Sequence, residues 1–84
     1  MRTQFIVQED DIKKREKFFD YIIDNYDLKI HYPFKKELFV KSKFPFVIDF
    51  EDNTFWICNS IICCACAAQN NSIFSIKQFK KLRR

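Results

Sequence analysis

The chain has 84 residues, a formal net charge of +4 and no glycine. This length corresponds to one domain, residues 1–84, with a marginal core. Hydrophobic residues make up 48% of the chain and aromatic residues 18%, which is too apolar for a disordered protein. The missing glycines exclude phosphate-binding loops, the dinucleotide fingerprint and the nucleophile elbow, because these motifs depend on glycine backbone.

Positive charge is concentrated in two segments. Residues 28–44 contain five basic side chains and one acidic side chain, and residues 72–84 contain five basic side chains and no acidic one.

The longest apolar run, residues 55–68, is interrupted by Asn59 and Ser60 and is shorter than the roughly 20 residues of a membrane span. The first residues lack the apolar run of a secretory signal. We expect a cytoplasmic protein without membrane contact, whose four cysteines are thiols.

The chain is predicted to begin with a strand and a long helix. Residues 3–8 favour a strand with Phe5 and Val7 on one face and Ile6 on the other. Asp10 or Asp11 then caps a helix that runs to about residue 26. The apolar positions that suggest this helix follow a 3.6-residue period: Ile12, Phe19, Ile22, Ile23 and Tyr26. Basic residues cluster on its first turns: Lys13, Lys14, Arg15 and Lys17.

The middle of the chain is predicted to form strands. Residues 27–34 allow a short strand that Pro33 ends or confines to an edge. Residues 37–42, 46–51 and 54–58 are each predicted as strands. A two-residue turn at Asp52 and Asn53 pairs Phe50 with Phe55 and Ile48 with Ile57. One face of this hairpin is then wholly apolar: Phe46, Ile48, Phe50, Phe55 and Ile57.

Two C-terminal segments each leave two possibilities. Residues 60–69 favour a Cys/Ala-rich helix capped by Asn59 or Ser60, or a buried strand as far as Cys64. Residues 72–84 suit a helix ending in a basic tail over residues 77–84, or a strand over residues 73–79. The predicted fold class is α+β, a small antiparallel sheet packed against one long N-terminal helix, with the second short helix as a further packing element.

The candidate chemical sites favour structural roles. Cys63 and Cys66 form a C-x-x-C pair, but zinc needs four convergent ligands and a redox motif needs an exposed thiol. Small buried residues that pack closely explain this segment better. As a general base, His31, the single histidine, would need an orienting carboxylate; Asp27 and Asp49 are available, but nothing in the sequence places them beside it. Asp49, Glu51 and Asp52 suggest a Mg²⁺ site only weakly, because acidic residues are ordinary at a hairpin tip. We expect no cofactor, no metal and no catalytic residue.

The basic segments give the best functional indication. Basic side chains neutralise phosphates and aromatic rings stack on unpaired bases, so their mixture suits single-stranded RNA or DNA, or a protein partner. The predicted binding residues are Lys35, Lys36, Phe39, Lys41, Lys43, Phe44, Lys77, Lys80, Lys81, Arg83 and Arg84.

The sequence therefore predicts a non-catalytic binding protein. Its small size and composition are typical of accessory proteins of phages and mobile elements, although no motif carries that likeness. The first hypothesis is a factor that inhibits or redirects a nucleic-acid-processing enzyme through a basic and aromatic surface. The second is a stand-alone RNA- or DNA-binding module, and the third a small metal-dependent enzyme. We also expect a homodimer, because the apolar side chains exceed what one small core needs.

Overall fold

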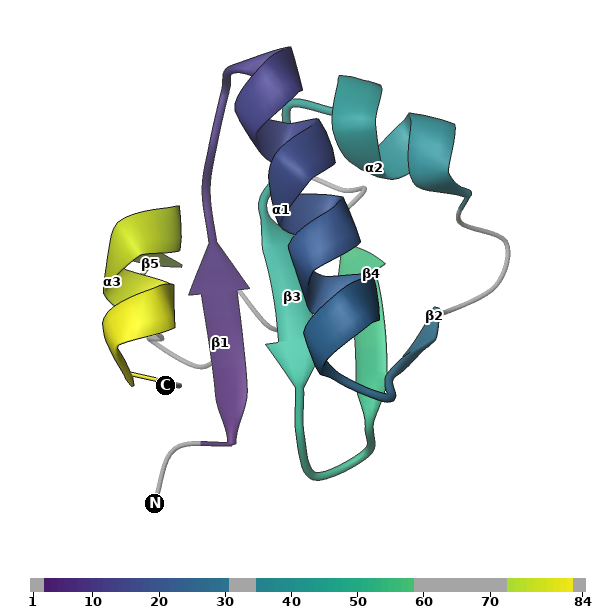
Figure 1. The fold of residues 1–84 in the computed structure, drawn as a ribbon, viewed down its shortest axis with the longest axis vertical. Helices are drawn as coiled ribbons and strands as arrows, with labels where there is room; N and C mark the ends of the chain where they lie inside the picture. The colour runs from purple at the N-terminus through teal and green to yellow at the C-terminus, as the bar shows by residue number, and fades with distance from the viewer. Residues whose placement is uncertain (1–2, 31–34, 59–72, 83–84) are drawn as a thin grey trace.

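The protein has an α+β fold with a five-stranded sheet. The computed structural model describes residues 3–30, 35–58 and 73–82. Within them the order of elements is β1 (Gln4–Val7), α1 (Ile12–Asn25), β2 (Lys29–Ile30), α2 (Lys36–Lys41), β3 (Phe46–Asp49), β4 (Thr54–Ile57), β5 (Ile73–Phe74) and α3 (Ile76–Leu82). Figure 1 shows α1 lying across the sheet, with α2 beside its N-terminal half and α3 on its other side.

The sheet is mixed rather than antiparallel throughout. Its strand order is β2-β4-β3-β1-β5. β3 pairs antiparallel with β1 and β4, as the predicted sheet requires, but each edge strand, β2 and β5, pairs parallel with its neighbour. Each parallel pairing covers only two residues, and such short parallel strands carry too little periodicity to be recognised in a sequence.

The first strand and the first helix confirm the sequence prediction, with changes in which residues face the core. Asp11 is the N-cap of α1, and its carboxylate accepts hydrogen bonds from the backbone N–H of Lys13 and Lys14. The residues of α1 buried against the sheet are Arg15, Phe18, Phe19 and Ile22. Ile12 and Ile23, predicted to face the core, are instead exposed.

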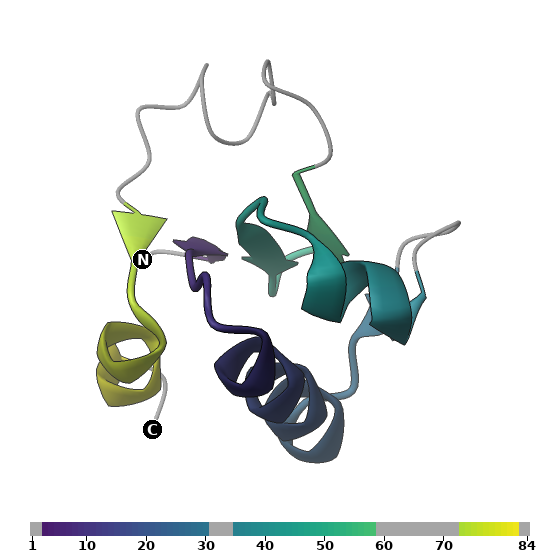
Figure 2. The same ribbon diagram turned by 90° about the horizontal axis from the view of Figure 1, so that it is seen from above.

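Aromatic rings fill the core between the helices and the sheet. α1 and α3 lie on the same side of the sheet (Figure 2). Seven of the eleven phenylalanines are buried there: Phe5, Phe18, Phe19, Phe39, Phe46, Phe55 and Phe79. Many of these rings meet edge to face, for example Phe18 and Phe79 with centroids 5.5 Å apart. The aromatic residues thus mainly build the core rather than a surface.

Residues 37–42 were predicted as a strand, and this is wrong. The segment forms the short helix α2, in which the adjacent residues Phe39 and Val40 are both buried. A strand would turn these two side chains to opposite faces. The Lys41 ammonium donates to the Glu37 carboxylate at 3.0 Å, an i,i+4 pair that favours a helix.

A buried arginine joins α1 to the C-terminal end of α2. Arg15 is 0% exposed, and its guanidinium lies 4.1 Å from the centroid of the Phe46 ring. Its Nε and Nη2 donate to the Phe39 carbonyl at 3.0 and 2.6 Å, and Nε also reaches the Val40 carbonyl at 3.2 Å. Nη1 donates to the Glu9 carbonyl at 2.7 Å. A cation here satisfies acceptors of the last turn of α2, which the helix itself leaves without partners.

Burial lowers the pKa of the Arg15 guanidinium, and the negative charges of Asp10 and Glu9 act in the opposite direction. An arginine still keeps its charge, because its ordinary pKa is so high. The segment that precedes α1 therefore supplies both a carbonyl ligand and the compensating carboxylates for this buried cation.

The hairpin of β3 and β4 has the predicted faces but not the predicted register. Ile48 pairs with Phe55 and Asp49 with Thr54, so the loop spans residues 50–53 rather than two residues. The Asp49 carboxylate accepts hydrogen bonds from the backbone N–H of Glu51 and Asp52 at 2.9 and 3.1 Å, which builds this longer turn. Asn53 has a positive φ of 57°, which asparagine tolerates better than most residues. A shift of two residues keeps every side chain on its face.

The C-terminal segment combines the two predicted alternatives. Ser75 ends β5 and begins α3 through a reciprocal capping box: its hydroxyl accepts from the Gln78 backbone N–H, and the Gln78 side chain accepts from the Ser75 N–H. The capping box fixes the start of α3, which buries Phe79 and leaves its lysines exposed.

The opposite face of the sheet carries a second apolar cluster of Ile6, Val47 and Cys58, with Trp56 packed against it.

The predicted Cys/Ala-rich helix over residues 60–69 lies outside the described residues, as does His31. In the part of the chain that the structure describes, the longest helix, α1, has 14 residues and no helix is long and apolar enough to cross a membrane.

Replacing Arg15 tests how far the fold depends on it. Arg15→Met keeps much of the side-chain volume but leaves the Glu9, Phe39 and Val40 carbonyls without their donor. We expect the free energy of unfolding to fall by about 2–4 kcal/mol in urea denaturation. Lys13→Met on the exposed side of the same helix is the control, with a change within about 0.5 kcal/mol. Equal stabilities for the two variants would refute the role given to Arg15.

Candidate anion-binding groove

The two flanks of α1 carry opposite charge. Glu16 and Asp20 are one turn apart on the flank beside α2, whereas Lys14 and Lys17, also one turn apart, line a groove beside α3. The buried residues Arg15, Phe18, Phe19 and Ile22 separate the two flanks, because they fix which side of the helix faces the sheet. Charge is therefore sorted by the same helical period that sorts burial.

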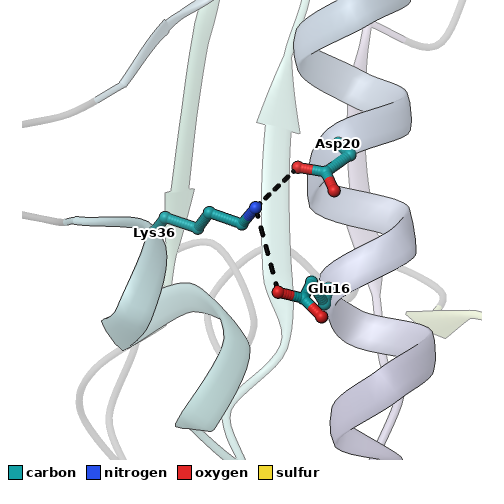
Figure 3. Close-up of polar contacts among 3 residues, drawn as sticks. All are labelled: Glu16, Asp20 and Lys36. Carbon is teal, nitrogen blue, oxygen red and sulfur yellow. Dashed lines mark ion pairs between the residues drawn. The ribbon is translucent and has the colours of Figure 1, made fainter.

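The acidic flank is partly neutralised by one lysine of α2. Figure 3 shows the Lys36 ammonium reaching from α2 to both carboxylates of α1, 2.9 Å from Asp20 and 3.9 Å from Glu16. The hydrogen bond to Asp20 raises the pKa of Lys36, as expected for an ammonium beside carboxylates. All three side chains are about half exposed, so this cluster orients α2 but contributes little to stability.

The basic flank faces α3 across an open groove of about 440 Å³. Two lysines come from each helix, and all four are exposed: Lys14 and Lys17 from α1, and Lys77 and Lys80 from α3. The other lining residues are Glu9, Phe18, Ser75 and Ile76. Four ammonium groups against one carboxylate make this groove strongly positive.

The lysines of the groove differ from those near α2 in their partners. Among the described residues, the ion pairs involve only Lys36 and Lys41. Lys80 lies over the ring of Tyr21, with its nitrogen 4.3 Å from the centroid, a contact that orients the side chain without cancelling its charge. The one acidic residue of the groove, Glu9, uses its carboxylate to accept a hydrogen bond from the Asp11 backbone N–H at 3.0 Å.

The floor of the groove is apolar. Ile76 is only partly buried against the core and presents carbon surface between the two rows of lysines, whereas Phe18, which also lines the groove, is 1% exposed. The Ser75 hydroxyl is already engaged in the cap of α3. The groove thus combines a ring of ammonium groups with a carbon floor, and it is suited to an anionic ligand with apolar groups of its own.

The structure separates the predicted binding residues. Phe39 belongs to the core at 0% exposure and cannot stack on a base, so it is withdrawn from the predicted surface. Lys36 and Lys41 are on α2 in ion pairs, Lys35 precedes that helix, and Lys43 and Phe44 follow it as exposed residues. Lys77, Lys80 and Lys81 are exposed on α3, the first two in the groove. Arg83 and Arg84 lie outside the described residues.

Lys14 and Lys17 were not among the predicted binding residues. The sequence signal for them is their i,i+3 spacing, which places both on one side of the helix. Their approach to Lys77 and Lys80 depends on how α1 and α3 pack, which no local pattern encodes.

The other chemical candidates acquire structural roles where the structure describes them. Both oxygens of Asp49 accept hydrogen bonds, one from the turn and the other from the Gln4 amide at 3.3 Å. Cys58 is a buried thiol. In residues 3–30, 35–58 and 73–82, no three His, Cys, Asp or Glu side chains are close enough to hold a metal ion. Cys63, Cys64 and Cys66 lie outside those ranges.

Comparisons of the chain with protein-family models, with curated proteins and with solved structures gave no match.

The contrast between the two lysine groups predicts opposite effects on stability. Lys36→Gln removes the ion pairs with Asp20 and Glu16 and should lower the melting temperature only slightly, because the pairs are half exposed. The double variant Lys14→Gln/Lys77→Gln removes facing like charges and should leave the melting temperature unchanged or raise it. Thermal unfolding at about 0.01 M and 1 M salt measures both, and high salt should shrink each difference. A melting temperature lowered equally by both changes would contradict this description.

Proposed function

We propose that the chain is a non-catalytic binding protein that holds an anionic macromolecule in the groove between α1 and α3. The observation that carries the proposal is the group of four exposed lysines, none in an ion pair with a described carboxylate, around the partly exposed side chain of Ile76. Like charges held on facing helices repel one another. A bound anion relieves this repulsion, so part of the binding free energy comes from the protein's own charge arrangement.

The positive charge of the groove limits which surface of a nucleic-acid-processing enzyme such a protein can bind. The nucleic-acid cleft of such an enzyme carries positive charge, and a positive groove is repelled by it. An accessory factor of a phage or mobile element that inhibits or redirects the enzyme would therefore bind an acidic surface elsewhere on it. The small size of the chain and its basic groove support this proposal.

A stand-alone nucleic-acid-binding module is the second candidate. Lysines are well suited to phosphates, which they contact as point charges without reading sequence. The stacking part of the original hypothesis is weaker, because seven phenylalanines are in the core and, among the described residues, only Phe44 is an exposed phenylalanine. The burial of these rings also removes much of the reason to expect a homodimer. The mass of the protein in solution measures its oligomeric state directly. A cytoplasmic location is also part of the proposal.

Two matched variants test the proposed groove. One replaces Lys14, Lys17, Lys77 and Lys80 by Gln, and the other replaces Lys35, Lys36, Lys41 and Lys43, so both change the net charge equally. Fluorescence anisotropy is measured with labelled polyglutamate and with a labelled single-stranded oligonucleotide at low salt. We expect the first variant to lose at least about tenfold in affinity for the anion that binds, and the second much less.

The control is the melting temperature of each variant, which shows that the fold is kept. Affinity of the unaltered chain should fall as salt rises, because the contacts are ionic. Equal losses in the two variants would mean that net charge, and not the groove, attracts the anion. Absence of binding to both probes at low salt would refute the proposal.

A further inference from the structure

We infer that the occupant of the groove is an acidic amphipathic segment of a partner protein. Its carboxylates would meet the lysines of α1 and α3, and its apolar side chains would cover Ile76. This inference rests on the proposed function and names the kind of partner. It depends on three features of the described residues: the charge of the rim, the carbon floor and the spacing of the lysines.

The carbon floor favours a protein segment over a nucleic acid. A nucleic acid covers carbon surface by stacking its bases on exposed rings. The ring of Phe18, the aromatic side chain that lines the groove, is 1% exposed and offers no face for stacking. The neighbouring ring of Tyr21 has the Lys80 ammonium 4.3 Å from its centroid and stacks on the Phe18 ring at 6.3 Å. Phosphates alone would satisfy the lysines and leave the floor in water, whereas leucine-like side chains would cover it.

The spacing of the lysines fits an acidic helix. On each side of the groove the two lysines are three residues apart, which is a rise of about 4.5 Å along a helix axis. Carboxylates at i and i+3 or i+4 of a partner helix repeat at a similar rise, on either side of an apolar stripe. A helix laid along the groove would place carboxylates against both rows of lysines with its stripe on the floor.

The groove is too small to enclose such a helix. At about 440 Å³ it is comparable with a small-molecule site and holds the side chains of one or two turns. The partner therefore contributes a short motif, with the rest of its surface outside the groove, and binding is expected to be weak and dependent on salt.

Four labelled probes distinguish the possible occupants, each tested with the full chain at low salt. The first is an amphipathic peptide of about 14 residues with glutamates flanking a stripe of leucines. The second has the same composition in an order without a stripe, and the third has serine in place of leucine. The fourth is a single-stranded oligonucleotide of equal charge. We expect the first peptide to bind at least about tenfold more tightly than the other three probes.

The variants keep the test specific to the groove. Affinity for the first peptide should be lost when Lys14, Lys17, Lys77 and Lys80 are replaced by Gln, and kept when Lys35, Lys36, Lys41 and Lys43 are replaced. Equal affinities for the three peptides would overturn the inference while leaving an anion-binding groove in place. Tightest binding of the oligonucleotide would overturn it in favour of a nucleic acid. Absence of binding by all four would reject the proposed function itself.

Discussion

The buried guanidinium of Arg15 is the interaction on which the arrangement of the helices depends. Its donors satisfy carbonyls of Phe39 and Val40 at the end of α2 and of Glu9 just before α1, so one side chain joins α1 both to the segment that precedes it and to a helix 24 residues later in the chain. A helix of six residues is too short to be stable alone. The cation at its C-terminal end, together with the packing of Phe39 in the core, explains why this segment is helical.

Fixing Arg15 toward the sheet also fixes which way the rest of α1 faces. Once Arg15, Phe18, Phe19 and Ile22 point inward, Glu16 and Asp20 must lie on one flank and Lys14 and Lys17 on the other. The acidic flank meets Lys36 of α2, and the basic flank meets the lysines of α3. The proposed binding groove is therefore a consequence of the same packing that forms the core.

Local patterns in the sequence predicted β1, α1 and the faces of the β3–β4 hairpin correctly, because period-2 and period-3.6 alternation encode burial directly. They failed at α2, where Arg15, 24 residues before Phe39, decides the structure. The hairpin register was wrong because the Asp49 carboxylate lengthens the turn. Arg15 itself was grouped with the lysines of the first turns and was not predicted to be buried, since charged residues seldom are. Two of the four groove lysines, Lys77 and Lys80, were among the predicted binding residues. The place of Lys14 and Lys17 beside them depends on how two helices pack, which the local sequence does not encode.

The central claim is that Lys14, Lys17, Lys77 and Lys80 attract an anion as one group, whereas Lys36 and Lys41 are already paired. NMR of ¹³C-methylated lysines during a titration with tripolyphosphate measures this directly. The account predicts that the signals of Lys14, Lys17, Lys77 and Lys80 shift first and together, with those of Lys36 and Lys41 nearly unchanged. Shifts that begin at Lys36 and Lys41, or that are equal for all lysines, would contradict it.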